Sequence, residues 1–426
     1  MSAGAVVLER LHEQPGGAEL ATLAERHRDV ALIGGAVRDL LLGRPPKELD
    51  VVVSGDAARF AGELLGMLEL REEGTPILTL HDRFGTAAVV WPAGRIDVAR
   101  RRGESYPVPG ALPEVRPGSE EEDLARRDFT VNALSVLLSG ERPGELVAVE
   151  HALADLEVGV LRVLHDQSFI DDPTRLLRLG RYRARLGFEI EPHTRELAEQ
   201  ALSARALDTV SGARIGAELR LALEEPDPLA AVRSLGELRV LSALGLADAL
   251  DGPLVARALE LLPEDGSLPQ LLLALLVLAS IHAHDERGQG FMRSVLDHLE
   301  FAAGERDRAL RAAFGAAELA ERMLGAGSRS ELHTALFGRE PEAVALAGAF
   351  AVGPDGDTAA DQARLWFDEL RHVRLAITGD DLLDAGVAPG PEIGMRLEAA
   401  LARKLDGALV GAGVPAELKA ALEAGS

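Results

Sequence analysis

Hydrophobic positions in the first third of the chain follow two different periods. Short apolar runs bounded by glycine, proline or charged residues predict β-strands at 30–33, 49–53, 76–80, 87–91 and 95–99. Apolar residues at helical spacing predict helices at 20–27, 37–42 and 57–67, and a helix followed by a strand within 129–138. The proline-rich segment 106–118 is expected to be a loop. This mixture predicts a small α/β head domain over residues 1–150.

Strand signals nearly vanish after residue 153. Leucine, alanine, arginine and glutamate recur at helical spacing to the end of the chain, with breaks at 226–228, 263, 354–356 and 389–391. We therefore predict a helical neck over residues 151–225 and a helical body and tail over 226–426. The longest apolar run, 271–281, is well short of the roughly 20 residues that span a bilayer, so no membrane segment is expected.

Composition narrows the possible functions. The chain of 426 residues contains no cysteine and carries a formal net charge of −24. The lack of cysteine excludes a disulfide scaffold, a thiolate zinc site and a cysteine nucleophile. The acidic balance argues against a protein that coats nucleic acid indiscriminately. No signal-peptide pattern opens the chain, so we expect a cytoplasmic protein.

One basic stretch stands out in this acidic chain. The segment 174–186 contains no carboxylate and five arginines, namely Arg175, Arg178, Arg181, Arg183 and Arg185. Such a stripe on an acidic protein can grip phosphates, and its alternative interpretation is a solvated helix face.

A glycine pair and two carboxylates suggest phosphate chemistry. Gly34 and Gly35 lie at a predicted strand-to-helix junction, where the backbone can approach a phosphate and the free N–H groups of the helix favour an anion. Glu48 and Asp50 are two residues apart on a predicted strand, so their side chains point to the same face. Carboxylates aimed at one spot repel each other unless a cation lies between them, and Mg²⁺ is the cation that phosphate chemistry uses. Asp97 is a third candidate, and an exposed strand edge with ordinary acids is the alternative.

These motifs together resemble the catalytic signature of class II tRNA nucleotidyltransferases, the family of CCA-adding enzymes and poly(A) polymerases. The run 34–43 followed by Glu48-Leu49-Asp50 carries the resemblance, and the run 126–133 is similar to the family motif Arg-Arg-Asp-Phe-Thr-x-Asn-Ala. The run 171–178 looks like the Glu-Asp-x-x-Arg motif, and 214–219 and 377–394 resemble further family segments. The resemblance implies an α/β head of the polymerase-β-like nucleotidyltransferase type, followed by an all-helical neck, body and tail.

The resemblance also implies an activity and a set of site residues. The enzyme would add some or all of the 3′-terminal CCA to tRNA from CTP and/or ATP, without a template, releasing pyrophosphate and using Mg²⁺. Glu48, Asp50 and Asp97 would be catalytic, and Glu48 and Asp50 would hold the metal. The nucleotide-binding residues would be Gly34, Gly35, Arg38, Arg126, Arg127, Asp128, Asn132, Asp172, Arg175 and Arg178. The alternatives are an enzyme that adds only A or only CC, a poly(A) polymerase, and a helical RNA-binding protein with an inactive head.

Three features depart from the family pattern. Glu48 stands where the family usually has aspartate, and Asp171 stands where glutamate is usual. The segment 106–113 lacks the charged residues that many CCA-adding enzymes carry there. In this respect the loop looks closer to relatives that add only part of CCA.

Asp172 and Arg175 are the candidates for base selection. Asp172 followed by Pro173 fits a helix start with Asp172 as its N-cap, which is the purely structural interpretation. Three residues apart on a helix, Asp172 and Arg175 would present an acceptor beside a forked donor. Cytosine and adenine both show an amino donor next to a ring-nitrogen acceptor, whereas uracil and guanine show the reverse. The pair would therefore accept CTP and ATP and refuse UTP and GTP.

Overall fold

The computed structural model describes residues 2–70, 74–81, 85–283, 288–351, 354–409 and 413–424. It divides into two compact units, of which the first comprises Met1–Glu218 and Glu225–Ala243. The second comprises Leu219–Glu224 and Leu244–Ser426. The predicted head and most of the predicted neck thus fall in the first unit, and the boundary between them near residue 150 stays a prediction.

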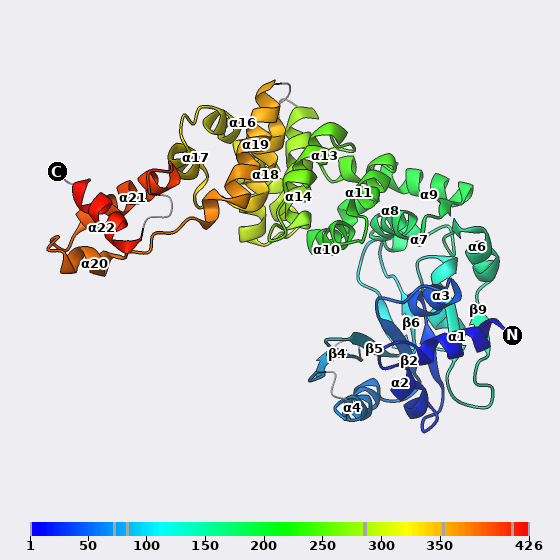
Figure 1. Cartoon of the computed structure of the whole chain (residues 1–426). Helices are drawn as coiled ribbons and strands as arrows, with labels where there is room; N and C mark the ends of the chain where they lie inside the picture. Colours follow the sequence, from blue (N-terminus) through cyan, green and yellow to red (C-terminus); the bar gives the residue numbers. More distant parts are fainter. Residues whose placement is uncertain are drawn as a thin grey trace. The chain divides into compact units, whose positions relative to one another are not determined.

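A seven-stranded mixed sheet forms the centre of the first unit, in the order β3-β4-β5-β2-β1-β8-β9 (Figure 1). Its strands are β1 (Val30–Ile33), β2 (Leu49–Val53), β3 (Ile77–His81), β4 (Thr86–Trp91), β5 (Gly94–Arg100), β8 (Leu134–Leu137) and β9 (Leu146–Ala148). Strands β2 and β5 run parallel, with Asp50 opposite Asp97, and the other neighbouring strands are antiparallel. The sheet order thus places two carboxylates that are distant in sequence on adjacent strands.

Helices of the first unit pack on this sheet or on one another: the third and fourth contact its strands, and the first and second pack against those two helices. They include α1 (Ala3–His12), α2 (Gly17–Ala24), α3 (Gly35–Leu41) and α4 (Ala57–Leu68). Helix α4 begins at the N-cap Asp56, which accepts hydrogen bonds from the backbone N–H groups of Ala58 and Arg59 at 2.9 and 3.2 Å. Its buried face includes Phe60 and Leu64, each contributing about 1.5–3 kcal/mol relative to exposure.

The strand and helix predictions for the head are largely confirmed, with two wrong segments. The segment 106–118, expected to be a loop throughout, contains strand β7 (Glu114–Pro117), which pairs antiparallel with β6 (Arg102–Ser105). All four residues of β7 are exposed, so no alternation of apolar and polar residues marks the strand. The helix expected within 129–138 is a single 3₁₀ turn, Thr130–Asn132, before β8.

The helices that follow in the first unit are α6 (Ala152–Val158), α7 (Ser168–Asp171), α8 (Arg175–Leu186), α9 (Pro192–Ser203), α11 (Pro228–Glu237) and α12 (Val240–Ala243). A short parallel pair, β10 (Val160–Leu161) and β11 (Glu189–Ile190), was not expected in this helical region. Helices α8 and α11 pack closely at Gly180, where a Cβ would lie 2.6 Å from a methyl group of Leu235. Helix α10 (Gly212–Leu223) contributes residues to both units.

The second unit is helical throughout its described part. It contains α13 (Gly252–Leu261), α14 (Leu268–Ala283), α15 (Gln289–His298), α16 (Ala303–Leu324), α17 (Arg329–Leu336), α18 (Pro341–Phe350), α19 (Pro354–Asp368), α20 (Gly379–Asp384), α21 (Pro391–Leu405) and α22 (Val414–Glu423). Helix α14 is buried on every side over residues 270–278, as expected of a helix that is apolar all round. The predicted fold class, a mixed α/β head followed by a mostly helical remainder, is confirmed.

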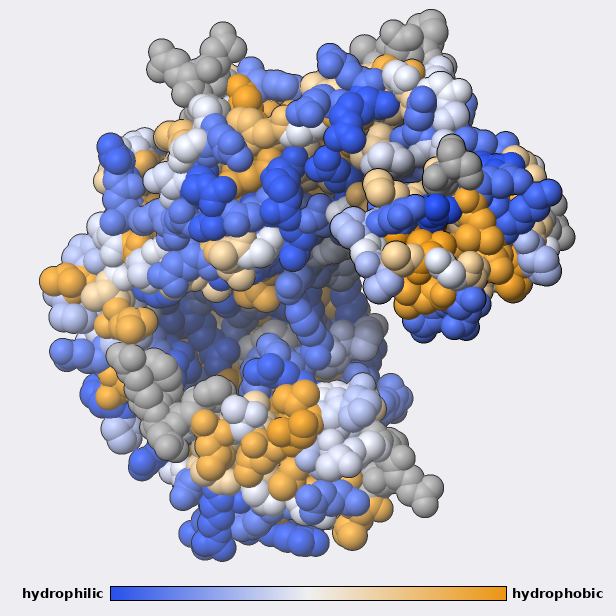
Figure 2. All heavy atoms as spheres, turned by 90° about the vertical axis from the view of Figure 1, so that its left-hand side faces the viewer, coloured by the Kyte–Doolittle hydropathy of each residue, from blue (hydrophilic) through white to orange (hydrophobic). Residues whose placement is uncertain are grey.

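The described helices include no candidate for a membrane span. None of the described helices is both long enough and apolar enough to cross a bilayer. On the face drawn in Figure 2, hydrophilic side chains predominate and hydrophobic ones form separate patches. The exposed hydrophobic side chains of the described residues include Ile77 and Leu80 on β3 and Val90 on β4.

Candidate active site

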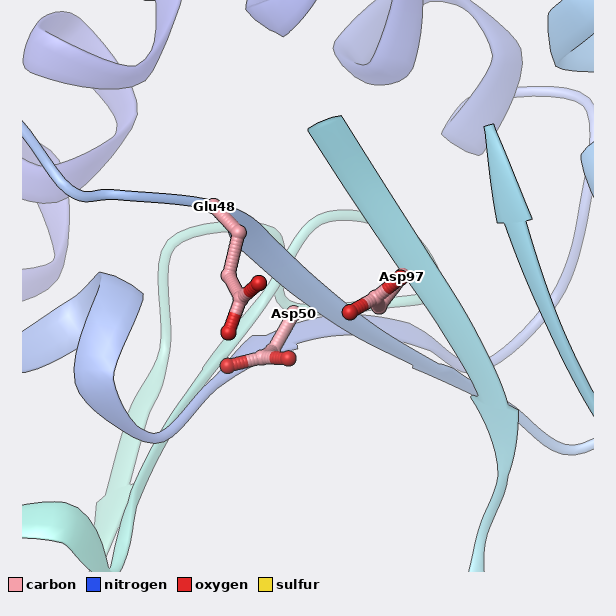
Figure 3. Close-up of side chains that lie close together, drawn as sticks. All are labelled: Glu48, Asp50 and Asp97. Atoms are coloured by element: carbon pink, nitrogen blue, oxygen red, sulfur yellow. The ribbon is translucent and has the colours of Figure 1, made fainter. Parts of the chain in front are cut away.

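Three carboxylates converge on the parallel strand pair β2 and β5. Glu48 and Asp50 come from one end of β2 and Asp97 from β5, and each offers an oxygen within 4.8 Å of the others (Figure 3). The side chains point toward one another, because residues two apart on a strand share a face and Asp50 lies opposite Asp97. We call Glu48, Asp50 and Asp97 the acidic triad. The convergence expected from the sequence is present.

The acidic triad makes Asp50 hard to ionise. Burial raises the pKa of Asp50 to about 7, and the neighbouring carboxylates of Glu48 and Asp97 add to the rise, while the cations Arg127 and Arg95 oppose it. Repulsion of this kind is relieved by a divalent cation, and carboxylate oxygens are the ligands that Mg²⁺ prefers. The donor set therefore fits a hard metal ion.

A pocket of about 310 Å³ opens beside the acidic triad. Asp50 and Asp97 lie on its wall, and four guanidinium groups also line it, from Arg95, Arg102, Arg126 and Arg127. A space with carboxylates on one part of its wall and guanidinium groups on another suits a metal-bound polyphosphate.

The glycine turn brings Arg127 close to the sheet. Gly34 adopts φ 69°, a conformation that favours glycine, and a Cβ there would lie 2.5 Å from Nη1 of Arg127. The Asp123 carboxylate accepts hydrogen bonds from the guanidinium groups of Arg126, at 2.8 Å, and Arg127, at 3.1 Å. Arg126 and Arg127 lie just after the end of α5 (Glu120–Ala125). Gly35 is the first residue of α3.

Asp128 lies at the centre of a buried polar network. Its carboxylate accepts from Asn132 Nδ2 at 2.9 Å and from Arg178 Nε and Nη2 at 2.8 and 2.6 Å. Burial opposes ionisation of Asp128, but the guanidinium of Arg178 and the amide of Asn132 outweigh it and hold the pKa of this carboxyl well below its usual range. The buried Arg38 donates to Asn132 Oδ1, and both Arg38 and Arg178 lie over the ring of Tyr182. The structure thus brings together four of the predicted nucleotide-binding residues, and their side chains bind one another: Arg38, Asp128, Asn132 and Arg178.

The basic stretch of 174–186 is not a free cationic surface. Its five arginines all have acceptors within the protein: Arg175 with Ser168, Arg178 with Asp128, Arg181 with Glu218 and Glu225, Arg183 with Glu237, and Arg185 with Asp39. Phosphate binding by this stripe stays a prediction, and the structure shows that each of its arginines already has an acceptor within the protein. The carboxylates that neutralise it come from outside the segment, so no local charge pattern announces them.

Asp172 and Arg175 lie around the start of α8 in a way that the sequence only partly predicts. The helix begins at Arg175 with Thr174 as its N-cap, so the expected N-cap Asp172 lies outside it. Asp172 Oδ1 accepts from Thr174 N and Oγ1 at 3.1 and 2.6 Å and from Arg214 Nη2 at 2.8 Å. The buried Arg175 donates to Ser168 Oγ at 2.7 Å and to the carbonyl oxygen of Arg126 at 2.8 Å.

Comparison with known proteins identifies the family. The model of the poly A polymerase head domain matches residues 30–162. A CC-adding tRNA nucleotidyltransferase of Deinococcus radiodurans is 36% identical over 352 residues, which are 79% of this chain and 84% of that protein. The chain belongs to the tRNA nucleotidyltransferase family. It is also 33% identical over 403 residues, or 89% of its length, to an A-adding tRNA nucleotidyltransferase of Geobacter sulfurreducens, of which it spans 43%. The CCA-adding enzyme of Thermotoga maritima in complex with tRNA is similar in structure, with a TM-score of 0.69, 26% identity, and 96% and 95% of the two chains covered.

Nucleotidyltransferases of this family generally depend on a metal ion, and the acidic triad is suited to one. Two further arginines contact residues of the candidate site of this family member. Arg95 bonds to Glu48 and Asp97, and Arg214 bonds to Asp172 and to the carbonyl oxygen of Gly110. The sequence could have indicated Arg95, because it lies two residues before Asp97 on a predicted strand and therefore shares the same face of the sheet. Arg214 lay in a motif noted from the resemblance, but its partners come from segments about 40 and 104 residues away.

The raised pKa of Asp50 predicts an unusual effect on the stability of this family member. Because folding makes Asp50 bind its proton more tightly, its contribution to stability falls as the pH rises from about 4 to about 7. Asp50→Asn should therefore raise the free energy of unfolding at pH 8 in EDTA, by about 2–4 kcal/mol, and the gain should narrow toward pH 5. Urea unfolding at both pH values measures this, with Asp56→Asn as the control because asparagine also caps helices. A variant less stable than wild type at pH 8 would contradict the prediction.

Loss of the buried charge at Asp128 should have the opposite effect. Asp128→Asn leaves Arg178 without its closest carboxylate, so the free energy of unfolding at pH 7 should fall by about 3–5 kcal/mol. Arg183→Gln breaks only a solvent-exposed pair with Glu237 and should cost about 1 kcal/mol or less. Urea denaturation of both variants checks the contrast, and equal losses would show that the Asp128 network is not a special source of stability.

Proposed function

We propose that this protein extends the 3′ end of tRNA by transferring nucleotides from CTP, ATP or both, without a template and with release of pyrophosphate. The observation that carries the proposal is the acidic triad on two parallel strands, beside a pocket lined by guanidinium groups. The relatives support it, since they are named A-adding, CC-adding and CCA-adding enzymes. The chain spans less than half of the Geobacter protein.

The acidic triad would hold the metal. Glu48 and Asp50 would be its ligands, with Asp97 as the third carboxylate, and Mg²⁺ is the cation whose chemistry fits the donors. Bound there, Mg²⁺ would supply Lewis-acid stabilisation of the charge that develops as a phosphoryl group is transferred. The triad itself would orient the reacting ends, because two of its members belong to the rigid sheet.

The pocket residues would bind the nucleotide. Arg127, which lies against Gly34 and beside Asp50, is the guanidinium best placed for the triphosphate. Gly34 and Gly35 would let the backbone approach the phosphates, and Arg126 would add a second fork. Arg38, Asp128, Asn132 and Arg178 bind one another, so they would act on the nucleotide by holding this wall of the pocket in place.

Base selection is assigned to Asp172 and Arg175. All the hydrogen bonds that the described residues donate to the Asp172 carboxylate go to Oδ1, which leaves Oδ2 as an acceptor for an amino group. Arg175 donates two of its five N–H groups to Ser168 and to the Arg126 carbonyl, so its position is set by neighbours. This fixed acceptor–donor edge would match cytosine and adenine. Residues 1–150 would then be the catalytic head, 151–225 the base-selecting neck, and 226–426 the tRNA-binding body and tail.

Single-nucleotide incorporation decides which part of CCA is added. Purified protein is offered tRNA that ends before CCA, after C or after CC, with each labelled nucleoside triphosphate alone. CTP incorporation into the first two substrates indicates CC addition, ATP incorporation into the third indicates A addition, and both indicate full CCA addition. Long A tails would favour the poly(A) polymerase alternative, and no incorporation with any substrate would leave an RNA-binding protein with an inactive head.

A further inference from the structure

Arg95 lies across the acidic triad. It precedes Asp97 by two residues on β5 and therefore shares its face of the sheet. Its Nε is 3.0 Å from both oxygens of Asp97, and its Nη2 is 3.0 Å from Oδ2. The same Nε lies 3.3 Å from Oε2 of Glu48. One guanidinium thus links the carboxylate from the end of β2 to the one on β5.

The oxygens that Arg95 engages are the ones a divalent cation needs. Mg²⁺ requires its oxygen ligands at about 2.0–2.1 Å, closer than a guanidinium holds them, and takes them in a near-octahedral arrangement. A guanidinium and a divalent cation at the same oxygens would also repel each other. Because Arg95 engages both oxygens of Asp97 and Oε2 of Glu48, the cation and the guanidinium would compete for these two carboxylates. The Arg95 side chain is 47% exposed, so it has space to leave these oxygens.

We propose that Arg95 is the built-in counter-ion of the acidic triad, and that a divalent cation binds by displacing its guanidinium from Glu48 and Asp97. The proposal rests on the metal site proposed above. Arg95 is a positioning residue in this account. Before the metal arrives it keeps two mutually repelling carboxylates together, and it weakens metal binding because the cation has to compete with it.

Metal titration of the full chain tests this exchange without measuring activity. Binding of Mn²⁺ to metal-free protein is followed by the electron paramagnetic resonance signal of free Mn²⁺, and binding of Mg²⁺ by calorimetry. Arg95→Gln removes the competing charge and should bind either metal about tenfold more tightly than wild type. Arg95→Lys keeps the charge and should remain closer to wild type. Arg59→Gln removes an exposed arginine paired with Glu63 on α4 and should leave metal affinity unchanged.

Thermal unfolding supplies a second readout and a check on folding. In EDTA, Arg95→Gln should melt below wild type because the triad loses its counter-ion, and added Mg²⁺ should raise its melting temperature by more than that of wild type. Equal or weaker metal affinity in Arg95→Gln, with binding by the wild type intact, overturns the role of Arg95 alone. Absence of binding in wild type and Arg95→Gln alike, or binding that survives Asp50→Ala, overturns the metal site itself and the proposal with it.

Discussion

Replacing Asp50 with alanine should lower nucleotide incorporation by about a thousandfold or more, while tRNA binding stays nearly intact. Asp50 is the central member of the acidic triad, flanked by Glu48 just before its own strand and by Asp97 directly opposite. Its loss removes a carboxylate from the group that would carry the metal, and charge stabilisation of this kind is worth several kcal/mol in the transition state. Single-turnover incorporation and filter binding of tRNA measure the two quantities separately.

The matched controls for Asp50→Ala distinguish chemistry from folding. Glu48→Asp keeps a carboxylate of the type usual in the family and should retain measurable activity. Asp56→Asn removes a carboxylate from the same unit at a helix cap and should leave incorporation unchanged. Unchanged turnover in Asp50→Ala would contradict the assignment of the triad.

Changing Asp172 or Arg175 should relax the choice of base before it abolishes catalysis. A good bidentate contact discriminates by about 1–3 kcal/mol, or about ten- to a hundredfold for each base. In Asp172→Asn the oxygen can stay with Thr174 and Arg214, so the amide would turn a donor toward the base in place of Oδ2. Incorporation of UTP and GTP should then rise relative to CTP and ATP, measured one nucleotide at a time.

The alanine variants separate base selection from support of the helix start. Arg175→Ala loses the bonds to Ser168 and to the Arg126 carbonyl as well as any contact to the base. Equal loss of all four incorporations in Asp172→Ala and Arg175→Ala would show that the pair only supports the start of α8. Intact selectivity and rate would show that the family role does not apply here. Asp166→Asn, an exposed carboxylate paired with His193, is the control.

Sequence reasoning succeeded where one short segment contains its own explanation. The apolar runs at 30–33 and 49–53 match β1 and β2 residue for residue. Both strands are largely buried; β1 lies between Asp29 and Gly34, and β2 lies between Glu48 and Ser54-Gly55. The spacing of Glu48 and Asp50 likewise sets their common face. Strand β7 could not be predicted from the hydrophobic pattern, because it is exposed on both faces. It is recognised in the structure by its backbone pairing with β6.

The misread features depend on partners from distant segments. In the sequence, the arginines of α8 form a basic stripe without nearby carboxylates. In the folded chain they are paired with carboxylates from other segments: Glu218, Glu225, Glu237, Asp128 and Asp39. Asp172 reads as an N-cap until Thr174 takes that position. Ion pairing across more than about 40 residues leaves no period in the sequence, so only the folded chain reveals it.

Extension of a tRNA that ends before CCA is the decisive assay for the proposed transfer of nucleotides to the 3′ end of tRNA. The wild-type protein, with Mg²⁺ and all four nucleoside triphosphates, is incubated with tRNA substrates ending before CCA, after C and after CC, and the new 3′ ends are read by mass spectrometry. We expect the tRNA to grow by one to three nucleotides, consisting only of C and A, and to stop at or before a completed CCA end. Failure to extend any of the three tRNA ends, or tails that grow without a fixed stop or contain U and G, would contradict it.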